Sequence, residues 1–176
     1  MRKEPILKHR ILLPALLALA ASAAALADGG KPNFNKNVEF AEEGPWQEGD
    51  YQLPAYPAAP QWINVNLDNL QKNRIAVDAG SLSVGQDGVV RFILDVVSPG
   101  GVSNLSVEGI QCKNRAYRAY AFGDNVGKRW IRSTRAEWRT IPLEDRLRRE
   151  LRAALCPDGA APRDAGEALA SLRKNG

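Results

Sequence analysis

Histidine is almost absent from this chain, and its only copy, His9, lies in an N-terminal segment that we expect to be removed. The absence excludes Ser-His-Asp and Cys-His catalytic arrangements and every metal site that needs a histidine ligand. The sequence also lacks a Cys-x-x-Cys motif, a glycine-rich phosphate loop and internal repeats. Thiol redox chemistry and nucleotide binding therefore have no sequence support, and we expect no cofactor and no metal site.

Long apolar runs are scarce, and the first one has the organisation of a secretory signal peptide. Basic residues precede an apolar run from Ile11 to Leu19, and small residues follow up to Ala27. Small side chains at Ala25 and Ala27 fit a signal peptidase, and the run is shorter than the roughly 20 residues of a membrane-spanning helix. We expect residues 1–27 to be a cleaved signal peptide and the mature protein to be periplasmic, without a transmembrane helix. The alternative is a retained N-terminal anchor.

The basic excess of the chain, 24 Lys and Arg against 20 Asp and Glu, comes largely from the expected signal peptide. Without residues 1–27 the net charge is about +1, so nucleic-acid binding loses most of its support. Residues 28–112 carry 11 acidic against 5 basic side chains, and residues 113–152 carry 12 basic against 5 acidic ones. In one domain these regions would face each other or share a solvated surface.

Residues 28–60 are rich in proline and lack a regular periodicity, which predicts an extended strap. Aromatic residues interleave with the prolines, namely Trp46, Tyr51, Tyr56 and Trp62. They either plug apolar gaps on the surface of the domain or form a platform for a sugar or a peptide. Nothing in their spacing favours the platform.

Residues 61–156 form the expected globular domain, because short apolar segments alternate there with turn residues. The run from Val89 to Val97 is apolar on both faces, so we expect a central strand in which Arg91 and Asp95 need partners. The short turns indicate antiparallel neighbours. We predict an α+β fold with an antiparallel meander of about five to seven strands.

A leucine stripe between Pro142 and Pro157 predicts one packed C-terminal helix that begins near Pro142. Leu143 starts the stripe, and Pro157 ends the helix. Residues 157–176 are rich in alanine with glycine, proline and mixed charge, and we expect a flexible tail with at most one short, weak helix.

Cys112 and Cys156 are the only cysteines, and an even number in an exported chain predicts a disulfide. The bridge would close a loop of about 44 residues, worth roughly 4 kcal/mol in the chain-entropy model. In an ideal helix Cys156 points away from the leucine stripe, but Pro157 favours extended geometry at residue 156. Two separate buried thiols are the alternative.

Three short motifs stand out as a set, and later tryptophans and the final cysteine follow them. The motifs are Asp87-Gly88-Val89-Val90-Arg91-Phe92, Glu108-Gly109-Ile110-Gln111-Cys112 and Tyr120-Ala121-Phe122-Gly123, and the later residues are Trp130, Trp138 and Cys156. Together they resemble the cryptic neisserial protein family over residues 38–156. The resemblance implies a bacterial envelope protein of no established activity, with no catalytic residues to transfer. Its members are often described as lipoproteins, but no cysteine stands at the expected cleavage site, so no lipid anchor is expected.

The basic segment between residues 113 and 139 allows two interpretations. Arg129, Arg132 and Arg135 are candidates for an anion-binding face, because arginine beside aromatic residues can bind phosphates and carboxylates. Alternatively, these arginines stabilise the fold by pairing with acids of the N-terminal half, namely Asp78, Asp95 or Glu108. We favour this second interpretation, because the mature chain is nearly neutral.

The function that fits these observations is a non-enzymatic binding module of the bacterial envelope. Its partner would be an anionic envelope component or another envelope protein, and not nucleic acid. The second hypothesis is a hydrolase of cell-wall carbohydrate, because a pair of carboxylates can perform that reaction without histidine. The candidate carboxylates are Asp78, Asp87, Asp95 and Glu108, whose separations the sequence does not determine.

The first prediction concerns export. The mature N-terminus should be Asp28, because the residue pair Ala25 and Ala27 is the best cleavage signal after the apolar run. The intact mass of protein from a periplasmic fraction measures this directly. A mass that still includes residues 1–27 would contradict cleavage.

Overall fold

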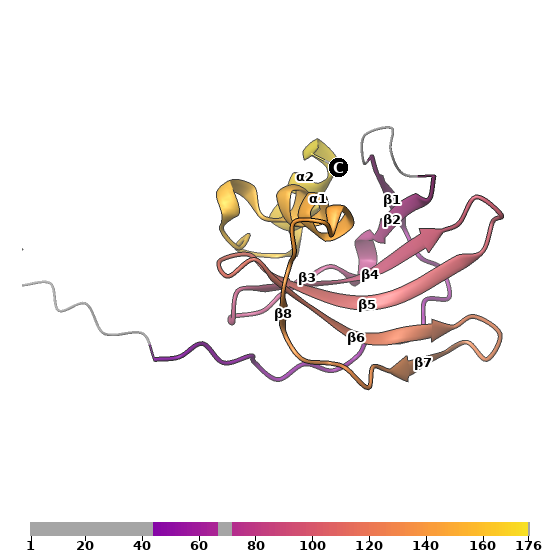
Figure 1. Cartoon of the computed structure of the whole chain (residues 1–176), viewed down its shortest axis with the longest axis horizontal. Helices are drawn as coiled ribbons and strands as arrows, with labels where there is room; N and C mark the ends of the chain where they lie inside the picture. Colours follow the sequence, from indigo (N-terminus) through magenta and orange to yellow (C-terminus); the bar gives the residue numbers. More distant parts are fainter. Residues whose placement is uncertain (1–43, 67–71, 176) are drawn as a thin grey trace, which may run out of the picture. The chain divides into compact units, whose positions relative to one another are not determined.

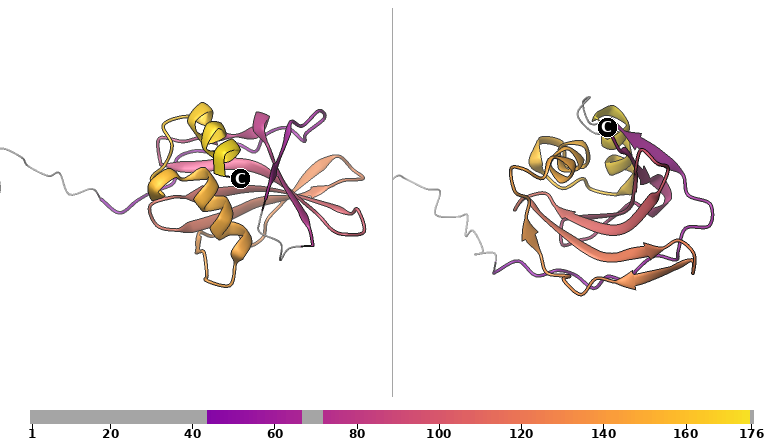
Figure 2. Two further views of the ribbon diagram at one scale, coloured as in Figure 1. Left: turned by 90° about the horizontal axis from the view of Figure 1, so that it is seen from above. Right: turned by 45° about the vertical axis from the view of Figure 1, so that its right-hand side comes forward.

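The computed structural model describes residues 44–66 and 72–175 (Figure 1). The expected signal peptide, residues 1–27, and the first part of the expected strap, residues 28–43, lie outside the described residues. An antiparallel sheet carries two α-helices on one face and an extended segment, residues 44–60, on the other (Figure 2). The predicted α+β fold is confirmed, and residues 44–60 are called the strap from here on.

The sheet has eight strands in the described part of the chain, one more than the upper end of the prediction. They are β1 (Trp62–Val65), β2 (Arg74–Asp78), β3 (Ser83–Val84), β4 (Val89–Val97), β5 (Ser103–Gln111), β6 (Ala116–Asp124), β7 (Arg129–Arg132) and β8 (Arg139–Thr140). The order is β1-β2-β4-β5-β6-β7, while β3 also pairs with β4 and β8 also pairs with β6. The expected meander therefore holds, and the two additional pairings come from strands of two residues each.

The strand β4 is central and buried on both faces, as its apolar sequence predicts. Phe92 and Leu94 point into a large core shared with the helices, and Ile93 points into a smaller core under the strap. Alternate residues of a strand face opposite sides, so one strand supplies both cores. The turn before β4 contains Gly88 with a φ of 72°, a conformation that glycine adopts without strain.

A β-bulge shapes the strap side of the sheet. Val107 of β5 pairs with Ala121 of β6, whereas Glu108 pairs with Ala119, so Tyr120 has no partner across the strands. The extra residue places Tyr120 and Ala121 together in the core under the strap. Bulges redirect side chains in this way, and here the redirected side chain is the tyrosine of the candidate site.

The helix α1 spans Arg146–Leu155, so the predicted start near Pro142 is wrong. The Asp145 carboxylate accepts a hydrogen bond from the backbone N–H of Arg148 and caps the first turn. An aspartate cap satisfies a free N–H group, which proline at the start cannot do. Leu143, expected in the apolar stripe, precedes the helix and is 84% exposed.

The predicted flexible tail is also wrong, because residues 165–175 form a second packed helix. The helix α2 spans Ala165–Asn175, and Ala168 and Leu172 are fully buried in the large core. The Ser171 hydroxyl donates a hydrogen bond of 2.7 Å to the carbonyl of Ala154 in α1. Tertiary packing of a small apolar face thus stabilises a segment whose composition alone indicates little structure.

A disulfide joins Cys112 at the end of β5 to Cys156 after α1, with a Cα–Cα distance of 5.6 Å. Cys156 has φ −117° and ψ 81°, so it has left the helical conformation. This departure, next to Pro157, turns the side chain toward the sheet. Both cysteines are buried.

Replacing Cys112 and Cys156 together with serine should lower the free energy of unfolding by about 2–4 kcal/mol, because the bridge restricts the unfolded chain. Urea unfolding of the oxidised wild type and the variant measures the difference. The reduced wild type should fall to nearly the same value, apart from packing of the buried thiols. Equal stability of the oxidised wild type and the variant would show that the bridge contributes nothing.

Candidate functional site

The strap runs along the sheet face opposite the helices, held by aromatic contacts and backbone hydrogen bonds. The Trp130 indole donates to the carbonyl of Pro54 at 2.9 Å, and the backbone N–H of Gly49 donates to Asp87 at 2.9 Å. The Tyr56 ring packs on Trp130 with centroids 5.0 Å apart. Tyr51 and Tyr56 therefore pack on rings of the sheet, as the first interpretation of that segment expected, whereas Trp46 and Trp62 remain more than a third exposed.

The centre of the strap is anchored by one carboxylate, that of Glu48. It accepts hydrogen bonds from the Tyr120 hydroxyl at 2.5 Å, from the Trp138 indole at 2.9 Å and from the Arg91 guanidinium at 3.1 Å. The Arg118 guanidinium forms a further ion pair with it. Glu48 is thus held by donors from β4, β6 and the segment before β8, and we call these five residues the Glu48 cluster.

The guanidinium of Arg91 in the cluster is nearly buried, with 4% of its side chain exposed. Asp87 binds it at 2.5 Å, and its Nε–H donates to the Tyr120 hydroxyl oxygen at 3.1 Å. The Tyr51 ring lies 4.8 Å from the guanidinium carbon, at cation–π distance. The carboxylates of Asp87 and Glu48 and the side chains of Tyr51 and Tyr120 thus compensate the charge of Arg91, the residue for which the sequence analysis expected a partner.

Burial alone would raise the pKa of the Glu48 carboxyl, but the hydrogen bonds and the arginine charges together lower it below its usual range. The pKa of Asp87 is lowered in the same way, mainly by Arg91 against burial. Burial and the Glu48 carboxylate raise the pKa of the Tyr120 hydroxyl. Both carboxylates are therefore ionised at neutral pH, and Tyr120 remains a hydrogen-bond donor.

The side chain of Tyr120 has room because β5 carries glycine beside it. A Cβ atom on Gly109 would lie 2.7 Å from the Tyr120 hydroxyl oxygen, closer than side chains tolerate. The glycine and the bulge on β6 together place the tyrosine against Glu48.

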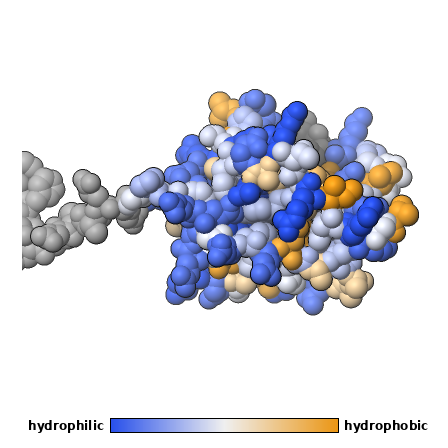
Figure 3. All heavy atoms as spheres, turned by 90° about the horizontal axis from the view of Figure 1, so that it is seen from below, coloured by the Kyte–Doolittle hydropathy of each residue, from blue (hydrophilic) through white to orange (hydrophobic). Residues whose placement is uncertain are grey.

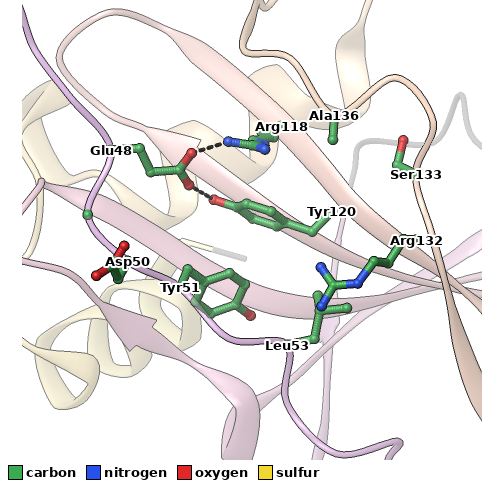
Figure 4. A pocket seen from close by; sticks show the side chains of 10 residues that line it. Glu48, Asp50, Tyr51, Leu53, Arg118, Tyr120, Arg132, Ser133 and Ala136 are labelled. Carbon is green, nitrogen blue, oxygen red and sulfur yellow. Dashed lines mark hydrogen bonds and ion pairs between the residues drawn. The ribbon is translucent and has the colours of Figure 1, made fainter.

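A cavity of about 410 Å³ opens beside the Glu48 cluster, between the strap and the chain that follows β7 (Figure 4). The strap contributes Asp50, Tyr51 and Leu53 to its lining, and Arg132 and Ser133 lie opposite. A backbone hydrogen bond of 2.8 Å from Ser133 to the Tyr120 carbonyl holds that chain against β6. The volume lies at the lower end of the range for small-molecule sites.

The three candidate arginines do not form one site. Arg132 lines the cavity, whereas the side chain of Arg129 is 74% exposed and pairs with Asp124 at 3.0 Å. Arg135 is exposed outside the cavity lining. The side chains of a strand alternate between faces, so Arg129 and Arg132 at the two ends of β7 lie on opposite faces, and Arg135 follows the strand.

The favoured pairing of Arg129, Arg132 and Arg135 with Asp78, Asp95 or Glu108 is wrong, because each of those acids is bound elsewhere. Within the same basic segment, Arg118 does pair with an acid of the N-terminal half, Glu48. Asp78 accepts from the backbone N–H groups of Gln61 and Gly80, and Asp95 accepts from the Ser103 hydroxyl. Glu108 is paired instead with the α1 arginine, Arg148, at 2.7 Å. Asp87 is bound to Arg91, and none of the four hydrolase candidates lines the cavity.

Sequence reasoning missed Glu48, Arg118 and Asp50. A buried arginine in the apolar β4 indicated that a carboxylate was needed, but nothing local identified Glu48, which is 43 residues away. Within the described ranges, no three His, Cys, Asp or Glu side chains gather to hold a metal ion.

Comparison with known proteins identifies the family to which this chain belongs. The model of the CNP1-like family matches residues 41–173, which include the strap, the whole sheet and most of α2. The chain belongs to the CNP1-like family. It is 31% identical to cryptic neisserial protein 1 of Neisseria gonorrhoeae (strain ATCC 700825 / FA 1090) over 180 residues, covering 90% of this chain and 88% of that protein. No solved structure matches.

The family match confirms the resemblance inferred from the motifs. The matched region, residues 41–173, begins well before the first motif at Asp87 and ends after Cys156. The CNP1-like region includes the Glu48 cluster and the cavity, so both belong to the shared domain. The relative's name states no activity, and function must be argued from the site itself. Among residues 44–66 and 72–175, no helix combines the length and apolar character needed to cross a bilayer.

Glu48→Gln should lower the free energy of unfolding at neutral pH by roughly 2–3 kcal/mol, because charge-assisted hydrogen bonds are lost. The folded-state pKa of Glu48 is depressed, so its contribution is present above the unfolded pKa of about 4.3 and is lost as pH falls through the folded value. The variant should therefore show a flatter decline of stability below about pH 4. Urea unfolding over a pH series measures both effects.

The matched control is Glu137→Gln, which removes an exposed carboxylate next to Trp138. It should change neither the stability at neutral pH nor its decline in acid by more than about 0.5 kcal/mol. A Glu48→Gln variant that behaves like this control would show that the cluster does not anchor the strap.

Proposed function

We propose that this protein is an exported, non-enzymatic binding module of the bacterial envelope, and that the cavity beside the Glu48 cluster takes an anionic group of its ligand. The N-terminal pattern of residues 1–27 supports export. The buried disulfide supports it independently, because such bonds persist in oxidising compartments.

The observation that carries the proposal is the guanidinium of Arg132. It lines the cavity, and no hydrogen bond or ion pair occupies it among the described residues. The neighbouring arginines, Arg91 and Arg118, already bind carboxylates. Arginine binds carboxylates and phosphates through paired N–H groups, so a free guanidinium at a cavity is suited to an anionic ligand.

The surrounding face supports binding in a polar cavity rather than on a flat apolar surface. Figure 3 views the domain from the strap side, and hydrophilic residues cover much of that face, with apolar residues gathered mainly toward one end. The carboxylates of Glu48 and Asp87 are ionised and accept hydrogen bonds from several donors, so they are poorly placed to transfer protons. This arrangement favours binding over catalysis.

Arg132→Glu should reduce by at least tenfold the amount of ligand that the protein retains when it is purified gently from the envelope of its native cells. The reason is that the charge reversal repels the anionic group. Native mass spectrometry measures the retained adduct. Arg135→Glu, an exposed change outside the cavity, is the control and should retain the wild-type amount. An adduct that survives Arg132→Glu, or no adduct on the wild type, contradicts the proposal.

A further inference from the structure

The cavity presents two opposite charges that the protein itself does not neutralise. Asp50, on the strap, and Arg132, at the end of β7, both line it, and neither side chain forms a hydrogen bond or ion pair within the described residues. By contrast, Glu48, Arg91 and Arg118 are paired within the Glu48 cluster, although the Nε–H of Arg118 has no partner among the described residues. Figure 4 shows Asp50 and Arg132 on either side of the Tyr51 ring.

We propose that this cavity binds a small zwitterion, a free amino acid or a short peptide with both ends unblocked. The ligand carboxylate pairs with Arg132 and the ligand ammonium with Asp50. The inference rests on the proposed function, and it narrows the ligand from any anion to one that also carries a positive group.

Charge is the reason to prefer a zwitterion over a polyanion. Glu48 and Arg118 also line the cavity, but their charges are paired with each other. The unpaired carboxylate of Asp50 repels a second negative group, and a cavity with one unpaired charge of each sign is complementary to a ligand with one of each. A volume of about 410 Å³ also restricts the occupant to a small molecule or the end of a longer one.

The side chains between the two charges suit the body of such a ligand. Tyr51 and Leu53 offer apolar surface, and the Tyr51 hydroxyl has no partner among the described residues. Burial raises the pKa of that hydroxyl, so it stays protonated and can donate to a carboxylate. The Ser133 Oγ accepts from the backbone N–H of Arg135, which leaves its own O–H free to donate.

Both walls of the cavity are held by the same anchor. Glu48 precedes Asp50 by two residues on the strap, and it also accepts a hydrogen bond from Trp138, which follows the opposite wall. The backbone segments that carry Asp50 and Arg132 are thus held in place before a ligand arrives, which reduces the entropy lost on binding.

The test uses alanine peptides of one to four residues, in both chiral forms, with free ends, an acetylated N-terminus or an amidated C-terminus. Binding is measured by NMR chemical-shift titration of the protein. At least one free-ended peptide should bind, and blocking either end should weaken it at least tenfold. In Asp50→Asn, acetylation of the peptide should no longer change its affinity, because the carboxylate that binds the ligand ammonium is gone. In Arg132→Gln, amidation should no longer change the affinity, because the guanidinium that binds the ligand carboxylate is gone.

The matched controls are Glu137→Gln and Arg135→Gln, which change exposed charges outside the cavity and should leave both dependences intact. Melting temperatures of Asp50→Asn and Arg132→Gln should stay near the wild-type value, because neither side chain has a partner to lose. The zwitterion inference is overturned if acetylated and free-ended peptides bind the wild type with equal affinity, or if no free-ended peptide binds. An adduct that still depends on Arg132 in the native-envelope experiment would then leave the proposed function standing.

Discussion

The structure depends on the carboxylate of Glu48 and the arginines that surround it. Arg91 lies in the central strand with almost no exposure, and an uncompensated charge at that depth is strongly destabilising. Asp87 and Glu48 compensate it from two sides. Because one of these carboxylates belongs to the strap, the segment without secondary structure is as necessary to the sheet as any strand.

The two faces of the sheet are stabilised by different interactions, mainly apolar burial on the helix face and polar and aromatic contacts on the strap face. The helix face buries a continuous apolar core and is closed by the disulfide and by the pairing of Glu108 with Arg148. The strap face has a smaller core, and its hydrogen bonds, ion pairs and ring contacts orient side chains closely. The free charges of the cavity lie on this second face, where the polar contacts hold both of its walls.

Membership of the CNP1-like family extends this argument beyond a single chain without deciding the activity. The matched region begins just before the strap and ends within α2, which indicates that both segments are parts of the domain rather than appendages. The function therefore has to be derived from the charges and donors of the strap face, on which the proposed recognition of a small charged molecule rests.

Local signals in the sequence were sufficient to predict the antiparallel sheet. Apolar character on both faces identified β4 as central, Asp87-Gly88 marked its turn, and the even cysteine count indicated the Cys112–Cys156 bridge. The start of α1 was misplaced, because the Asp145 cap outweighs the preference of proline for a first turn. The packing of α2 was missed, because the stability of this helix comes from burial of Ala168 and Leu172, which composition does not reveal.

The sequence by itself determined the fold class, the alternation that separates the two cores, and the need of Arg91 for a counter-charge. Only the tertiary structure decided which groups meet that need, since Glu48 lies 43 residues from Arg91, 72 from Tyr120 and 90 from Trp138. It also decided that Arg132 lines a cavity while Arg129 and Arg135 do not. Periodicity reports which face a residue occupies, whereas a charge pair depends on which distant segments the folded chain brings within a few ångströms.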